Sequence, residues 1–138
     1  MNAKPFAYVY ACYDPKILDG IYTWCKERFG EANFILAPDP GAAINFVSPK
    51  ILGTPEIVLS QMDLAHTKVH APLDMIVLIN HSSCGAYADA GATFPDAPTE
   101  EARHKNDLEQ AKKIVEEKFP GVPVEIHYFL KAEQRFAW

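Results

Sequence analysis

The sequence predicts an α/β protein: a single domain over residues 1–138, with one doubly wound, mostly parallel sheet and helices on both faces. Two observations support this prediction. Short apolar runs alternate with longer segments in which apolar residues recur at helical spacing, and this alternation is typical of strand–helix–strand units. In addition, 49% of the 138 residues are hydrophobic, which is enough for one core.

Strands are expected where apolar and β-branched residues cluster. The runs that meet this description are 6–11, 33–37, 75–79 and 124–130. The turn residues 38–41 follow the second run, and we expect the chain to be irregular from there to Gly53.

Helices are expected between these runs, each with a recognisable beginning or end. Pro15 suits the first position of a helix that Gly30 ends, and Thr54 with Pro55 begins a helix that extends to about Lys68. A short helical turn is expected at 82–90 and a loop at 91–98. The last helix begins near Glu100, where acidic residues favour the N-terminus, and stops at the Pro-Gly pair 120–121.

Composition and charge exclude several classes of function. The net charge is −5 without a cluster of basic residues, which argues against nucleic acid or an anionic membrane as the main partner. The longest apolar run, 75–79, is too short to span a bilayer, and the first residues do not resemble a signal peptide. We therefore expect a cytoplasmic protein, in which three cysteines do not indicate a disulfide framework.

Chemically versatile residues follow two of the expected strands. Cys12 and Asp14 come after the first strand, and His81 and Cys84 come after the third. In a doubly wound sheet these two strands can be neighbours, and ligands bind at their carboxyl ends. Two thiolates and one imidazole suit a zinc ion with a fourth position left over, and the start of a helix at Cys84 would lower the pKa of that thiol.

An ordinary structural interpretation also fits these residues. Cys12 and Cys84 are plausible buried thiols, His81 a hydrogen-bonded loop histidine, and Asp14 an N-cap for the helix after it. Cys25 lies on the apolar face of the first helix, where a free cysteine packs as a small hydrophobic residue.

The remaining histidines carry less information. His66 and His70 have a spacing that could share a metal, although exposed polar residues are the better interpretation. His104 lies in a charged stretch that we expect to be solvated, and His127 is out of phase with its apolar neighbours and should face the other side of its strand.

The two clusters resemble motifs of the β-class carbonic anhydrases. That family carries Cys-x-Asp-Ser-Arg after the first strand and Gly-His-x-x-Cys-Gly-Ala after the third, and this chain has CYDPK at 12–16 and NHSSCGA at 80–86. The order of elements is also similar from about residue 6 to 130. The resemblance implies zinc on Cys12, His81 and Cys84, with Asp14 as a neighbouring or fourth-ligand carboxylate. It also implies a homodimer.

The chain departs from the family pattern at several positions. The family's arginine, which holds the aspartate off the metal, is replaced by Lys16, and lysine lacks the bidentate guanidinium fork. Asn80 stands where the family has glycine, and 45–50 replace a family segment rich in asparagine. Almost nothing precedes the first strand, where the family has helices that embrace a partner subunit.

These considerations lead to two main hypotheses and a minor one. The first is reversible hydration of carbon dioxide to bicarbonate by zinc-bound hydroxide, with Asp14 accepting a hydrogen bond and Lys16 holding Asp14 or neutralising the site. The second is a non-catalytic zinc protein of the same fold, in which Asp14 closes the metal site. The third is hydrolysis of a related small molecule such as carbonyl sulfide or carbon disulfide.

Overall fold

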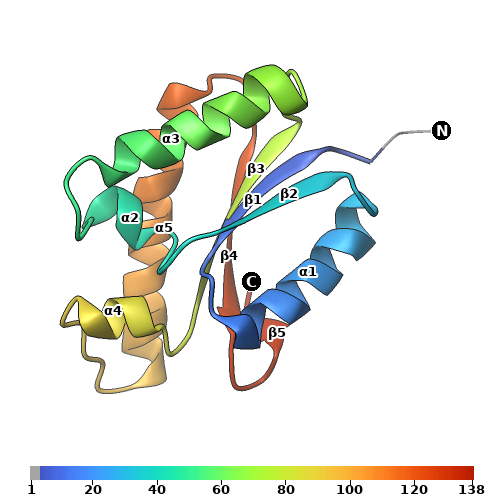
Figure 1. Cartoon of the computed structure of the whole chain (residues 1–138). Helices are drawn as coiled ribbons and strands as arrows, with labels where there is room; N and C mark the ends of the chain where they lie inside the picture. The colour runs from blue at the N-terminus through green and yellow to red at the C-terminus, as the bar shows by residue number, and fades with distance from the viewer. Residues whose placement is uncertain (1–3) are drawn as a thin grey trace.

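The computed structural model describes residues 4–138 and contains one five-stranded sheet with the order β2-β1-β3-β4-β5 (Figure 1). The first four strands are parallel and the short β5 runs antiparallel to β4. The strands are β1 (Ala7–Ala11), β2 (Phe34–Pro38), β3 (Met75–His81), β4 (Val124–Leu130) and β5 (Arg135–Phe136). The predicted α/β class with a mostly parallel sheet is confirmed.

Helices cover both faces of this sheet, with α1 on one side and α3 and α5 on the other (Figure 1). They are α1 (Pro15–Phe29), α2 (Ile44–Val47), α3 (Thr54–Leu64) with the π-helical turn η1 (Ala65–Val69), α4 (Gly85–Asp89) and α5 (Ala97–Lys118). Among residues 4–138, no helix is both long enough and apolar enough to cross a membrane.

The two faces of the sheet bury two separate sets of side chains, as the two-residue period of a strand requires. Tyr8 and Tyr10 of β1 pack toward α3 and α5, whereas Ala7, Val9 and Ala11 pack toward α1. β3 is buried along its whole length, which is expected of a central parallel strand covered on both sides.

The local predictions fail in two places. The stretch to Gly53, expected to be irregular, contains the short helix α2 with Ile44 and Phe46 buried. His104, expected to be solvated, is 0% exposed and lies on the buried side of α5. Lys105 and Glu109 near it are exposed while Asp107 is buried on the same side as His104, and a local count of charges does not resolve the two sides.

The order of the strands places the two predicted clusters at one edge. β1 pairs with β3 from Ala7 opposite Met75 to Ala11 opposite Ile79, so the two strands end side by side. The chain turns away in opposite directions after these two strands, to β2 and to β4, and this is where a doubly wound sheet opens a crevice. The residues that follow Ala11 and Ile79 are thereby brought together.

Candidate metal centre

Three of the predicted ligands meet at this edge. Cys12, His81 and Cys84 are buried, and one ligand atom from each lies within 4.8 Å of the others. The two Sγ atoms are 3.9 Å apart. The structure thus brings together one imidazole and two sulfurs, a donor set that zinc favours.

His81 is held with one ring nitrogen directed at this cluster. Its Nδ1–H donates a hydrogen bond to the carbonyl oxygen of Ser82 at 2.7 Å, so Nε2 is the ring nitrogen left for another partner. Nε2 is buried and has no hydrogen-bond partner. A buried polar atom without a partner is costly in a folded protein, and a metal ion would satisfy it.

The sulfur of Cys12 is positioned by the loop that follows β2. The backbone N–H of Gly41 donates to Cys12 Sγ at 3.3 Å. Gly41 has φ +76°, and Ala42 next to it also has a positive φ, of 46°, so this loop turns tightly over the sulfur. Such N–H donors stabilise a thiolate, which is the form that binds metal.

The two neighbouring thiols shift each other's pKa in opposite directions. The hydrogen bond with Cys84 lowers the pKa of Cys12 to about 4, although burial opposes this shift. The same hydrogen bond and burial raise the pKa of Cys84, and the backbone amides that begin α4 offset this only in part. The helix start does lower the Cys84 pKa, as expected, but the Cys12 sulfur beside it and burial have the larger effect, so the net shift is upward.

Asp14 lies outside the cluster of ligand atoms. It caps α1: Oδ1 accepts a hydrogen bond from the backbone N–H of Lys16 at 2.9 Å. Oδ2 forms an ion pair with Lys131 Nζ at 2.7 Å. Burial raises the pKa of the carboxyl, but the hydrogen bonds from Lys131 and the Lys16 amide outweigh it and lower the pKa overall.

Lys16 does not make the contact that the sequence suggested. Its side chain is exposed, and it holds Asp14 through its backbone amide, while the ammonium group paired with Asp14 comes from Lys131. Sequence reasoning missed Lys131, although a signal was present, because this residue directly follows β4, the strand next to β3 in a parallel sheet.

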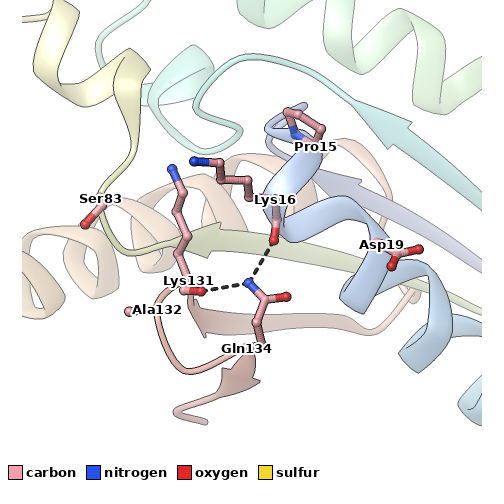
Figure 2. A pocket seen from close by; sticks show the side chains of 7 residues that line it. All are labelled: Pro15, Lys16, Asp19, Ser83, Lys131, Ala132 and Gln134. Carbon is pink, nitrogen blue, oxygen red and sulfur yellow. Dashed lines mark hydrogen bonds between the residues drawn. The ribbon is translucent and has the colours of Figure 1, made fainter.

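A cavity of about 740 Å³ opens beside the cluster, with Cys12 and Asp14 in its wall. A second, more open hollow of about 580 Å³ is lined by Lys16, Lys131 and Gln134 among others (Figure 2). The Asp14–Lys131 ion pair joins the linings of these two spaces. A small molecule has room to approach the sulfur of Cys12 from the larger cavity.

Asn80, which replaces a glycine of the resembled motif, organises a buried polar network behind His81. Its Oδ1 accepts from the N–H of Ala43, and its Nδ2 donates to Tyr87 Oη and to His104 Nδ1, both at 2.9 Å. Tyr87 in turn donates to Asp107 of α5. The network ties α4, α5 and the Gly41 loop to the strand that carries His81.

The other histidines have local partners. His66 Nδ1 accepts from the N–H of Leu73, and His70 Nδ1 donates to the carbonyl of Pro72, so the two do not form a shared site. His127 packs against Trp24 of α1, on the face predicted for it.

Comparisons with known proteins give a likeness in structure alone. No protein-family model and no curated protein matches the sequence. A carbonic anhydrase from Glaciozyma antarctica matches with a TM-score of 0.56 at 9% identity, over 99% of this chain and 82% of that one. The β-carbonic anhydrase CafA of Aspergillus fumigatus gives 0.55 at 11%, over 98% and 75%.

A third solved structure, one of two tetrameric β-carbonic anhydrases from Sordaria macrospora, gives a TM-score of 0.50 at 15% identity, over 98% of this chain and 80% of that one. The likeness extends over nearly the whole chain in all three cases. This protein therefore has the fold of these β-carbonic anhydrases, as the two motifs predicted, at 9–15% sequence identity to them.

Proposed function

We propose that this protein binds one zinc ion through Cys12, His81 and Cys84 and hydrates carbon dioxide reversibly. Two observations carry the proposal: Nε2 of His81 is buried without a hydrogen-bond partner, and one ligand atom each of His81, Cys12 and Cys84 lies within 4.8 Å of the others at the edge where β1 and β3 end. The fold adds support, because the similar solved structures are carbonic anhydrases.

Each residue of the site has a defined task in this proposal. Zinc held by three protein ligands supplies a Lewis acid with an open position that activates water near neutral pH. Nδ1 of His81 donates to the carbonyl of Ser82, which leaves Nε2 as the nitrogen for a metal, and the Gly41 amide donates to the sulfur of Cys12. Asp14, ionised and in the cavity wall, accepts a hydrogen bond from the reacting water.

Metal content tests the ligand assignment. Purified protein should hold about one zinc per chain by elemental analysis, and Cys84→Ser should lose most of it because one of three protein ligands is gone. Cys25→Ala is the matched control, since Cys25 is an equally buried thiol that packs in α1. Full zinc in Cys84→Ser would reject the assignment.

Stopped-flow carbon dioxide hydration at pH 7 and pH 9, on protein of known zinc content, tests the reaction. We expect zinc-dependent hydration at both values. Zinc-loaded protein that is inert at both would favour the non-catalytic alternative. Activity confined to pH 9 would indicate that Asp14 occupies the fourth position at neutral pH.

We also propose that the protein acts as a cytoplasmic homodimer with carbon dioxide and bicarbonate as its small-molecule partners and without binding nucleic acid or membrane. The acidic net charge of −5 supports the last two points. Tyr13 and Ile51, which are 60% and 70% exposed, line the cavity, so a second copy that covers them would also close the site.

A further inference from the structure

The ion pair between Asp14 and Lys131 is more enclosed than an ordinary surface pair. The Nζ–Oδ2 distance is 2.7 Å, and the two side chains are only 18% and 25% exposed. Ion pairs exposed to solvent contribute little to stability, because water screens the two charges and long side chains lose conformational entropy when they are held in one geometry. Here both factors are reduced, so the pair can hold the carboxylate in one orientation.

The backbone on each side of the pair is tied down. Lys131 N–H donates to Ser82 Oγ at 2.8 Å, directly after the metal-ligand candidate His81. The side-chain amide of Gln134 donates to the carbonyl of Lys131 at 2.7 Å and to the carbonyl of Lys16 at 2.8 Å, as the dashed lines in Figure 2 show. One amide group thus fixes the spacing between the segment that carries Asp14 and the segment that carries Lys131.

Asp14 needs such a restraint if the neighbouring cluster holds zinc. Carboxylate oxygens are zinc ligands, and Asp14 is only two residues from Cys12 in the same strand-to-helix turn. Its two oxygens are occupied instead by the Lys16 amide and the Lys131 ammonium group. The first contact is the helix cap, so the second is the one that decides where the other oxygen points.

We propose that Lys131 is the positioning residue that keeps Asp14 off the metal and leaves the fourth coordination position open. The effect of this role on catalysis rests on the proposed function. The hold of Lys131 on the Asp14 carboxylate does not depend on that function, and it can be measured with and without metal.

The metal-free experiment follows the Lys16 backbone amide by ¹⁵N-resolved NMR, because this N–H donates to Asp14 Oδ1. Lys131→Met should shift the resonance and speed its hydrogen exchange, and Lys131→Arg should restore both. Lys50→Met is the control, since it removes another cation paired with an aspartate, Asp89, near the cavity. An unchanged Lys16 amide in Lys131→Met would overturn the proposal.

The metal-loaded experiment uses cobalt in place of zinc and azide as a probe of the fourth position. Azide should change the visible spectrum of the wild-type cobalt protein. Lys131→Met should bind azide about 10-fold more weakly or worse, because Asp14 then takes that position. Lys131→Arg should restore azide binding, and so should the double variant Lys131→Met/Asp14→Asn, which removes the competing carboxylate.

The two experiments separate two failures. If the wild-type protein does not bind cobalt through its thiolates, the proposed function is wrong, and the Lys16 amide alone decides whether Lys131 positions Asp14. If cobalt binds and Lys131→Met takes azide as well as wild type does, the role of Lys131 is wrong while the metal site stands.

Discussion

Gly41 supports the Cys12 sulfur through its backbone conformation and position. Its φ of +76° is unfavourable for any residue with a Cβ, and a Cβ placed there would lie 2.6 Å from Ile44 Cγ2 and 2.9 Å from the Cβ of Ala86. The same residue donates its N–H to Cys12 Sγ. A side chain at this position therefore disturbs both the packing of the loop and the sulfur beneath it.

Gly41→Ala should reduce both stability and metal affinity. We expect the free energy of unfolding of metal-free protein to fall by about 1–3 kcal/mol from overpacking, beyond the backbone cost of about 1–2 kcal/mol. Zinc affinity should fall about 10-fold, because the N–H donor moves away from the sulfur. Urea unfolding and a competition titration with a chromophoric chelator measure the two effects.

Gly53→Ala is the matched control for Gly41→Ala. Gly53 also has a positive φ, of 89°, but a Cβ there meets nothing within 4 Å, so only the backbone cost is expected. Equal losses of stability in the two variants, with unchanged zinc affinity, would show that the Gly41 loop does not support the site.

α5 reaches the site through its buried face. His104 accepts a hydrogen bond from Asn80 at Nδ1, and its Nε2 is buried without a partner. Burial, followed by the charges of His81 and Arg103, lowers the pKa of His104 from 6.5 to about 3. The helix therefore carries a histidine that stays neutral in the folded protein over most of the acidic range.

This histidine makes the stability of the protein depend on pH. Between pH 6.5 and about 3 the unfolded chain binds a proton at residue 104 and the folded protein does not, so the free energy of unfolding falls as the pH falls. The slope from this one group approaches about 1.4 kcal/mol per pH unit. In His104→Asn, which keeps an acceptor for Asn80, the slope should be smaller by up to that amount.

Urea unfolding between pH 6 and pH 4, in the presence of a chelator, measures this slope without contributions from metal loss. Leu108→Val is the control, because Leu108 is fully buried in the same helix and does not titrate, and a roughly constant loss of about 1 kcal/mol is expected. If wild type and His104→Asn have parallel pH profiles, His104 is not neutral in the folded state.

Several exposed apolar side chains lie in or near the segment that lines the cavity. Leu52 is 99% exposed, Ile57 is 58% exposed, and both lie close in sequence to Ile51 at the cavity wall. Exposed apolar side chains that gather beside a cavity are typical of interfaces between proteins. In the proposed homodimer, a second copy of the chain would cover these side chains.

Sedimentation equilibrium should find wild-type protein at twice the 15.4 kDa mass of one chain. Leu52→Asp should shift it toward the monomer, because a charge would be buried in the interface. Leu64→Asp is the control: Leu64 is 61% exposed at the other end of α3 and should leave the dimer intact. A wild-type monomer at micromolar concentration would contradict the homodimer.

Local patterns were sufficient for the fold class and for the meeting of Cys12, His81 and Cys84. Apolar runs and capping residues located the strands and most helices, and the ends of parallel neighbouring strands share one edge of a sheet. That these three residues bind zinc, that the chain is one domain and that it turns over carbon dioxide stay predictions.

Only the tertiary structure decided which side chains surround that cluster. Lys131 rather than Lys16 pairs with Asp14, and His104 is buried rather than solvated. Both facts depend on contacts between segments far apart in the chain, through β4 beside β3 and α5 against the sheet. Hydrophobic period and residue type are local quantities, and they do not determine which of two lysines reaches a carboxylate or which side of a charged helix is covered.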